Sequence, residues 1–164
     1  TFGIEFDGNY SPVKALTLNF DLTYLSPRYD SFPNGVALNA GFTNSPANLT
    51  GRTPAGIPEV SLSTGFTYRR DIWQDVKLLL RSDYQWSSNT QIADGAPQFT
   101  RQVTSLNSSV SLQFKNGLEL SLWGRNLVDQ QFISTLFPSV AQPGSLSGYP
   151  SQPRTYGGSA RFKF

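Results

Sequence analysis

Few residues of this chain are of types that support chemistry. It contains 13 basic and 11 acidic residues, but no histidine and no cysteine. Histidine is the usual general base and the commonest transition-metal ligand, so triad hydrolysis and His-coordinated zinc are excluded within these residues. The lack of cysteine excludes disulfides and thiolate metal sites. We therefore expect no enzymatic activity, no cofactor and no metal centre.

Basic and acidic residues are interspersed along the chain, and Arg69-Arg70 is the only adjacent basic pair. The chain therefore lacks the basic stripe typical of nucleic-acid binding, and we expect no nucleic-acid partner. Many of the charged residues fall on the polar side of alternating segments. These are Asp21, Glu59, Lys77, Arg81, Asp83, Glu119, Arg125, Arg161 and Lys163. Their mixed signs favour salt-bridge ladders between neighbouring strands over a charge-selective pore.

The elements that must position these residues are strands. Seven segments alternate apolar and polar residues with a period of two, which predicts β-strands with two distinct faces. They are Phe2–Tyr10, Lys14–Leu25, Glu59–Tyr68, Val76–Trp86, Val103–Phe114, Leu118–Leu127 and a final strand that runs from Pro153 to the terminal Phe164. In the second segment Leu18, Phe20 and Leu22 share one face, whereas Asn19 and Asp21 lie on the other. In the fourth segment Leu79 departs from the pattern, because it falls on the polar side.

Strands of this kind can cross a membrane as barrel staves, with lipid on one face and a wet lumen on the other. Hydrophobic residues make up 38% of the chain and charged residues 15%, with 14 Gly and 11 Pro, which suits strands separated by turns. No run approaches the roughly 18 apolar residues of a membrane-spanning helix. The sequence thus predicts an all-β, antiparallel up-and-down meander of a membrane barrel.

Connections between the segments alternate in length. Short links lie at about Ser11–Val13, Arg69–Asp75 and Lys115–Gly117, and long ones at about Ser26–Pro58, Ser87–Gln102 and Val128–Gln152. Bacterial outer-membrane barrels have short periplasmic turns and long extracellular loops, so this alternation predicts that the last strand descends to the periplasm. Aromatic residues and cations in the long connections are candidates for ligand contact. They are Tyr29, Phe32, Arg52, Phe99, Arg101, Phe132, Phe137 and Tyr149.

Three short motifs carry a resemblance to a known family. They are Gly51-Arg52-Thr53-Pro54 with Ile57-Pro58-Glu59, Trp123-Gly124-Arg125-Asn126-Leu127-Val128-Asp129, and Pro153-Arg154-Thr155-Tyr156-Gly157. Their order and spacing, together with a C-terminal Phe, resemble the final third of TonB-dependent outer-membrane receptors, although family members commonly have Phe at the position of Val128. The residues themselves suggest structural roles, because Asn126 and Asp129 can bond nearby backbone at a turn and Gly157 permits close approach.

The resemblance implies a segment, residues 1–164, that forms the C-terminal part of a 22-stranded barrel in the outer membrane of a Gram-negative bacterium. It implies that earlier strands and an N-terminal plug domain precede this segment. It also implies import of a scarce solute, most often a ferric siderophore, with energy delivered to the plug through TonB. Tyr156, Phe162 and the terminal Phe164 resemble the signal that the barrel-assembly machinery recognises. Other partners implied are the outer-membrane lipid and a small ligand such as a metal chelate.

Two other architectures share the alternating pattern. A small porin-like barrel needs an even strand number in a bacterial single chain. A secreted β-sandwich binding module buries its apolar faces against each other and places loops at both ends.

Overall fold

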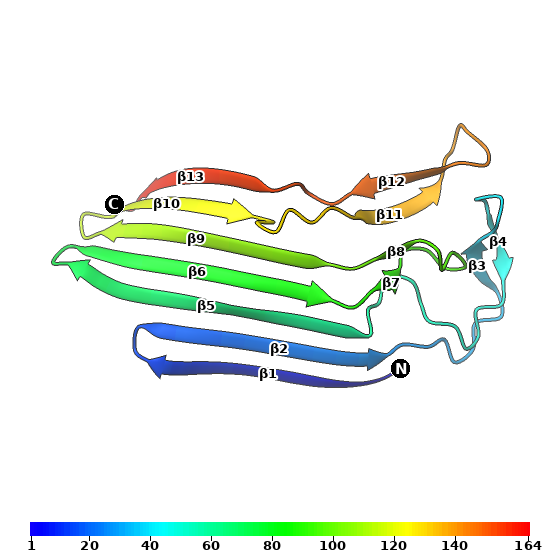
Figure 1. Ribbon diagram of the computed structural model, residues 1–164, viewed down its shortest axis with the longest axis horizontal. Helices are drawn as coiled ribbons and strands as arrows, with labels where there is room; N and C mark the ends of the chain where they lie inside the picture. Colours follow the sequence, from blue (N-terminus) through cyan, green and yellow to red (C-terminus); the bar gives the residue numbers. More distant parts are fainter.

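The computed structural model describes residues 1–164 and consists of strands and their connections. Seven long strands form one antiparallel sheet in the order β1-β2-β5-β6-β9-β10-β13, so each is hydrogen-bonded to the next long strand in the chain (Figure 1). They are β1 (Phe2–Val13), β2 (Leu16–Ser26), β5 (Val60–Trp73), β6 (Val76–Ser87), β9 (Thr104–Phe114), β10 (Leu118–Arg125) and β13 (Thr155–Phe162). The predicted seven-stranded meander is confirmed. No helix is long and apolar enough to cross a bilayer.

Strand register separates the side chains into an apolar face and a polar face. Residues paired across the ladder share a face, and Phe6, Leu22, Leu62 and Trp86 form one such row over four strands. The next row begins with Asp7 and continues with polar side chains. A shift of one residue in any strand would move its whole apolar set to the wrong face, so this pattern fixes the register.

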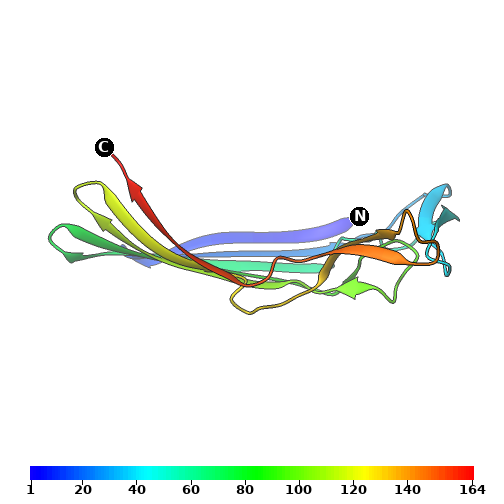
Figure 2. The same cartoon turned by 90° about the horizontal axis from the view of Figure 1, so that it is seen from above.

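The apolar face is left uncovered. Figure 2 shows a single bent layer, with no second sheet or helix packed against it. Only nine of the 164 residues are buried, and large apolar side chains such as Phe6, Leu122 and Tyr156 are more than half exposed. A β-sandwich would bury these side chains against a second sheet, so that alternative is excluded.

Hydroxyl groups on the apolar face are paired within the sheet. The Oγ atoms of Ser82 and Ser108 lie 2.8 Å apart, and the Thr64 hydroxyl donates to the Asn19 carbonyl oxygen at 3.0 Å. An unpaired hydroxyl in an apolar environment costs about 1–3 kcal/mol by protein mutational data, so these bonds make the face compatible with hydrocarbon.

All three tight turns lie at one end of the sheet and all three long connections at the other, as predicted (Figure 1). The turn after β9 is the predicted Lys115–Gly117, where Gly117 has φ of 89°, a left-handed conformation that favours glycine. The other two turns are shorter than expected. The predicted link Ser11–Val13 lies inside β1, and most of Arg69–Asp75 lies inside β5, because backbone pairing continues through both segments past a bulge.

Each long connection contains a two-stranded hairpin that the sequence pattern did not predict. The hairpins are β3 (Gly35–Leu38) with β4 (Asn44–Ala47), β7 (Thr90–Gln91) with β8 (Thr100–Arg101), and β11 (Ile133–Pro138) with β12 (Leu146–Pro150). Their strands have from two to six residues, too few to show a clear period-two pattern.

The C-terminal strand also ends earlier than expected. β13 stops at Phe162, and Phe164 is fully exposed beyond it. The backbone N–H of Lys163 still donates to the Gly117 carbonyl oxygen. The prediction that the final residue belongs to a strand is therefore wrong by two residues, because β10, the partner of β13, begins only at Leu118.

One glycine of β13 is required by packing. A Cβ atom at Gly157 would lie 2.3 Å from Trp123 Cζ2, since the indole ring lies directly on this residue from the neighbouring strand. At Gly158, the nearest atom to such a Cβ would be Leu122 Cδ2 at 3.4 Å, which is ordinary contact. Gly157 thus permits the close approach that was predicted for this glycine pair.

Gly157→Ala is expected to destabilise the sheet by about 1–3 kcal/mol, because the ring of Trp123 must move. Urea unfolding of the whole protein in lipid vesicles, followed by tryptophan fluorescence, measures this loss. Gly158→Ala is the matched control and is expected to change the free energy of unfolding much less. Equal effects at the two glycines would contradict the packing argument.

Leu22→Arg is expected to lower the stability of the protein in lipid vesicles by about 2–4 kcal/mol if the residue lies near the bilayer midplane. The reason is that this substitution places a cation on the apolar face. Asp21→Arg, one residue away on the polar face, is expected to have little effect on stability. The same unfolding assay applies, and comparable losses for both variants would show that the apolar face does not meet lipid.

Candidate functional site

Polar side chains from four strands meet at the loop end of the sheet. Asp21, Ser63, Gln85 and Ser105 are cross-strand partners on β2, β5, β6 and β9 and form one row. Thr23, Ser61 and Ser87 form a second row closer to the loops. The polar face therefore presents a continuous set of hydrogen-bonding groups where the long connections leave the sheet.

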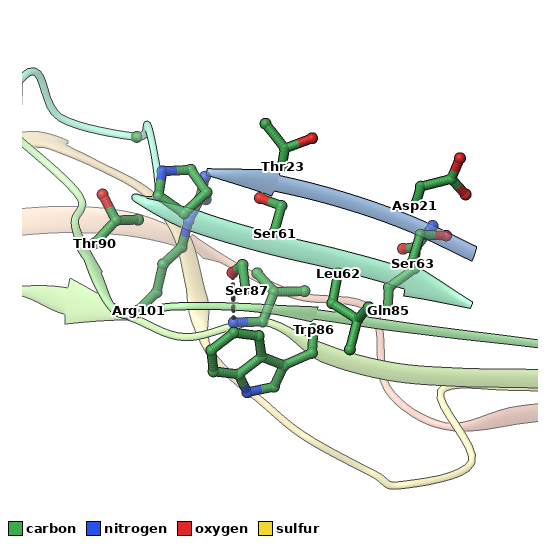
Figure 3. Close-up of a pocket in the computed structure, with 13 residues that line it drawn as sticks. Asp21, Thr23, Ser61, Leu62, Ser63, Gln85, Trp86, Ser87, Thr90 and Arg101 are labelled. Atoms are coloured by element: carbon green, nitrogen blue, oxygen red, sulfur yellow. Dashed lines mark hydrogen bonds between the residues drawn. The ribbon is translucent and has the colours of Figure 1, made fainter. Parts of the chain in front are cut away.

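A hollow of about 360 Å³ adjoins these rows, and Leu62 and Trp86 of the apolar face also line it (Figure 3). Loop residues Gly56, Pro58 and Thr90 line it together with the strand side chains, and Arg101 from β8 completes its wall. The hydroxyl of Thr90 donates to the Ile57 carbonyl oxygen at 3.1 Å, which joins the two loops at this point. Asp21 and Arg101 are the charged residues of this hollow.

A second hollow of about 320 Å³ adjoins the first and shares Gln85 and Val103 with it. Its lining includes Phe132, Asn107 and Arg125. Arg125 is the one charged residue of this hollow. We call the two hollows together the loop-end vestibule.

Arg101 lines the first hollow and contacts the third long connection. Its guanidinium donates through Nη1 to the Ser134 carbonyl oxygen of β11 and lies 6.0 Å from the centre of the Phe132 ring. Its Nε is buried and has no hydrogen-bond partner, and the residue makes no ion pair. A cation over an aromatic ring is stabilised modestly, so the charge of Arg101 is only partly compensated.

Arg125 is likewise held by an aromatic ring. Its guanidinium lies 5.0 Å from the centre of the Trp123 ring, and it makes no ion pair. Trp123 is in turn fixed against Gly157, as described above. The vestibule thus holds two arginines without carboxylate partners.

The loop residues predicted as ligand contacts are divided by the structure into separate groups. Arg101 and Phe132 meet at the vestibule. Tyr29 and Phe32 have ring centres 5.0 Å apart in the first long connection, and Phe137 and Tyr149 have ring centres 5.4 Å apart on the β11–β12 hairpin. Phe99 packs instead against Phe42 at 6.0 Å, and Arg52 is exposed beside a different hollow.

Of the charged residues predicted for the polar face, those within strands lie on that face by register, whereas Glu59 and Lys163 lie just outside β5 and β13. Few of these residues are ion-paired. Lys77 reaches Asp71 of β5 at 4.0 Å, the one cross-strand pair among them. Arg81 pairs within its own strand, to Asp83 at 2.9 Å. Glu119 stands opposite Arg161 but binds Gln113 and Ser121 instead. No ion pair involves Asp21, Glu59, Arg125, Arg161 or Lys163.

Residues of the second and third motifs, Trp123–Asp129 and Pro153–Gly157, take part in a hydrogen-bond network at the rim that the sequence analysis predicted only in part. Asn126, with φ of 49°, donates from Nδ2 to the carbonyl oxygens of Gln130 at 2.9 Å and Gln152 at 3.1 Å. Gln130 donates to the Gln102 carbonyl oxygen at 3.0 Å and accepts from the Thr104 N–H. Arg154 pairs with Asp129 at 3.2 Å. This network joins the loops after β8, β10 and β12.

The sequence analysis also did not single out Asp94, which joins two loops. Its carboxylate accepts from the Ala55 backbone N–H at 2.9 Å and from the Tyr29 hydroxyl at 3.3 Å. It therefore joins the first long connection to the second, next to a small core that includes the fully buried Leu49. No local pattern marks Asp94, because its partners are 39 and 65 residues away.

Burial raises the pKa of Tyr29, and the charge of Asp94 and its hydrogen bond raise that pKa further. The neutral phenol is therefore the form that the folded loops favour. Stabilisation from this contact is fully present below the ordinary tyrosine pKa of about 10 and is lost as pH rises through the raised value.

An antiparallel meander with one apolar face, one polar face and all its long loops at one end is the wall of a membrane β-barrel. Residues 1–127 match the family model described as TonB dependent receptor-like, beta-barrel. The chain belongs to this family of Gram-negative outer-membrane transport receptors, which confirms the predicted resemblance.

Solved structures agree on the fold. The ferric yersiniabactin uptake receptor FyuA from Yersinia pestis matches with a TM-score of 0.74 and 14% identity over 99% of this chain and 23% of that chain. The siderophore receptor PiuA from Acinetobacter baumannii matches with a TM-score of 0.68 and 15% identity over 99% of this chain and 21% of that chain. This chain thus spans less than a quarter of either receptor. A search of curated proteins gives no significant sequence match.

Asp94→Ala is expected to loosen the first two long connections by about 1–3 kcal/mol while leaving the sheet intact, because a backbone N–H and a phenol lose their acceptor. Hydrogen exchange of residues 27–57 in the whole protein measures the loss. In the unaltered protein, protection of this segment is expected to persist at neutral pH and to fall above about pH 10.

Asp30→Ala is the control, since Asp30 is an exposed acid of the first long connection and forms no hydrogen bond or ion pair through its side chain. Exchange in that variant is expected to match the unaltered protein. Equal protection in all three proteins would show that Asp94 does not hold the loops together.

Proposed function

We propose that residues 1–164 are the C-terminal segment of a 22-stranded receptor barrel in the outer membrane of a Gram-negative bacterium. In this proposal earlier strands pair with the free edge of β1, the first strand of the barrel pairs with β13, and a plug domain fills the lumen. The unpaired edges support the proposal, since exposed N–H and C=O groups at a sheet edge are not tolerated in hydrocarbon.

The proposed activity is import of a scarce solute, a ferric siderophore, driven by energy that TonB delivers to the plug. The long connections capture the ligand outside the cell, and the polar face lines its path and contacts the plug. The observation that carries this proposal is the loop-end vestibule, whose two hollows are lined largely by polar-face side chains and by residues of the long connections. The names of the two solved receptors support a siderophore as the ligand.

Residue roles follow from this placement. Arg101 and Phe132 are proposed ligand contacts at the base of the loops, and the aromatic pairs Tyr29–Phe32 and Phe137–Tyr149 are proposed contacts further out. Phe99 and Arg52 remain candidates from the same loops. The polar-face charges are proposed to meet the plug or water in the lumen. They are Asp21, Glu59, Lys77, Arg81, Asp83, Glu119, Arg125 and Arg161.

The C-terminal aromatic residues are proposed to be read by the barrel-assembly machinery. Tyr156, Phe162 and Phe164 are all more than half exposed, and Phe162 and Phe164 have ring centres 6.4 Å apart. Side chains with this exposure contribute little to folding stability, so contact with a partner or with lipid accounts for the presence of aromatic residues here.

Deletion of the receptor gene in its host is expected to abolish uptake of at least one radio-iron chelate under iron limitation. A strain that lacks TonB is expected to show the same loss, because transport into the periplasm requires the energised plug. The measurement is cell-associated iron over a panel of ferric chelates. Re-expression of the intact receptor is the control and restores uptake.

Unchanged uptake of every ferric chelate in the deleted strain, together with lost uptake of cobalamin or an oligosaccharide, would overturn the siderophore assignment and retain the transport role. Unchanged uptake of all three solute classes would overturn the transport role itself.

A further inference from the structure

One arginine departs from the separation of apolar and polar side chains over the sheet. Arg70 of β5 pairs with Leu78 of β6, so it lies on the apolar face, in the same row as Leu112 of β9. The other charged residues of the seven long strands, such as Lys77 and Glu119, lie on the polar face. Within the long strands, Arg70 is therefore the single charge on the face that meets lipid in a membrane barrel.

The position of Arg70 is close to the tight-turn end of this face (Figure 1). β5 ends at Trp73, three residues further on, which is roughly 10 Å of strand at about 3.3 Å per residue. Tyr68 precedes Arg70 on the same face, and Trp73, which pairs with Val76, follows it there. Tyr and Trp side chains favour the level of the lipid headgroups. Because the tight turns of such barrels face the periplasm, Arg70 lies near the headgroups of the periplasmic leaflet.

The acids nearest to Arg70 in the chain are engaged with other cations. Asp71 lies on the polar face, and its carboxylate is 4.0 Å from the Nζ of Lys77. Asp75, in the turn after β5, has its carboxylate 3.4 Å from the Nζ of Lys115. A cation on the lipid-facing side of a barrel is destabilising, by an amount that falls toward the interface. An anion in the headgroup layer would replace this cost by an attraction.

A second basic residue lies next to this part of β5. Lys14 is exposed in the turn between β1 and β2, and this turn is held beside β5 because the Arg69 N–H donates to the Ala15 carbonyl oxygen at 2.7 Å. Two neighbouring cations favour a lipid with a net negative charge, such as phosphatidylglycerol. Phosphatidylethanolamine is a poorer match, because its ammonium group balances its own phosphate.

We propose that Arg70, assisted by Lys14, binds the phosphate of an anionic phospholipid in the periplasmic leaflet, on the outer surface of the barrel. A guanidinium suits this ligand, since it donates two parallel hydrogen bonds to a phosphate. The acyl chains are then placed along Leu78 and Leu80 of β6, toward the middle of the apolar face. This lipid site lies on the face opposite the polar rows, so it is separate from the proposed path of the transported solute.

The test uses the whole receptor in detergent, titrated with phosphatidylglycerol or with phosphatidylethanolamine that has the same acyl chains. Native mass spectrometry counts the lipids bound and gives a dissociation constant for the first one. The intact receptor is expected to bind phosphatidylglycerol about fivefold or more tightly than phosphatidylethanolamine. Arg70→Gln is expected to reduce this preference to less than about twofold. Arg70→Leu, which matches the apolar neighbours of the residue, is expected to give the same loss.

Arg69→Gln is the matched control. It removes the same charge one residue away, but Arg69 lies on the polar face opposite Leu79. This variant is expected to bind both lipids as the intact receptor does. Glycerol phosphate, which carries the phosphate without acyl chains, is expected not to displace bound phosphatidylglycerol when the two are present at equal concentration.

Four results would overturn the inference. Equal affinity of the intact receptor for the two lipids means that the Arg70 side chain extends into water and selects no lipid. An unchanged preference in both Arg70 variants places the anionic lipid elsewhere on the barrel. The same loss in Arg69→Gln means that the total charge near the turns, and not the apolar-face arginine, sets the preference. Displacement by glycerol phosphate means that the ligand is a free phosphate. Transport of a siderophore is decided by none of these results.

Discussion

A polypeptide that crosses hydrocarbon must pair each backbone N–H and C=O group with another strand, because no water is present to replace the bond. In this chain seven strands joined edge to edge in sequence order meet the requirement between neighbouring strands, whereas the outer edges of β1 and β13 are unpaired. The ladder fixes which residues are neighbours, and hence which face each side chain occupies. Even the hydroxyls of Ser82 and Ser108, which fall on the apolar face, satisfy each other.

Because apolar and polar side chains lie on opposite faces of the sheet, the polar side chains do not pack against a hydrophobic core that would fix their positions. They are organised instead by cross-strand rows, such as Asp21, Ser63 and Gln85, and by contacts from the loops above. The small buried core of the molecule lies in those loops, around Leu49 and Ala37. The sheet thus forms the floor of the first hollow, and the packed loops determine its shape.

The rim network joins two motifs that are far apart in the chain. Asn126 of the first motif binds the backbone next to the second, at Gln152, and Asp129 pairs with Arg154 of the second. Trp123 and Gly157 form a further contact between them. These contacts hold the strand ends in register where the third long loop leaves the sheet, and so set the position of the hairpin that holds Arg101.

The sequence by itself determined the number of long strands, their two faces, the alternation of turns and loops, and the family. Period-two alternation is a local property, so the faces that residues such as Leu18 and Asn19 occupy can be assigned without knowledge of the fold. Only the tertiary structure decided which remote residues are in contact. Arg101 meets Phe132, whereas Phe99 packs on Phe42. Asp94 joins two loops, and Trp123 lies on Gly157. Those contacts join residues that are remote in sequence, and their energies depend on packing that no short pattern records.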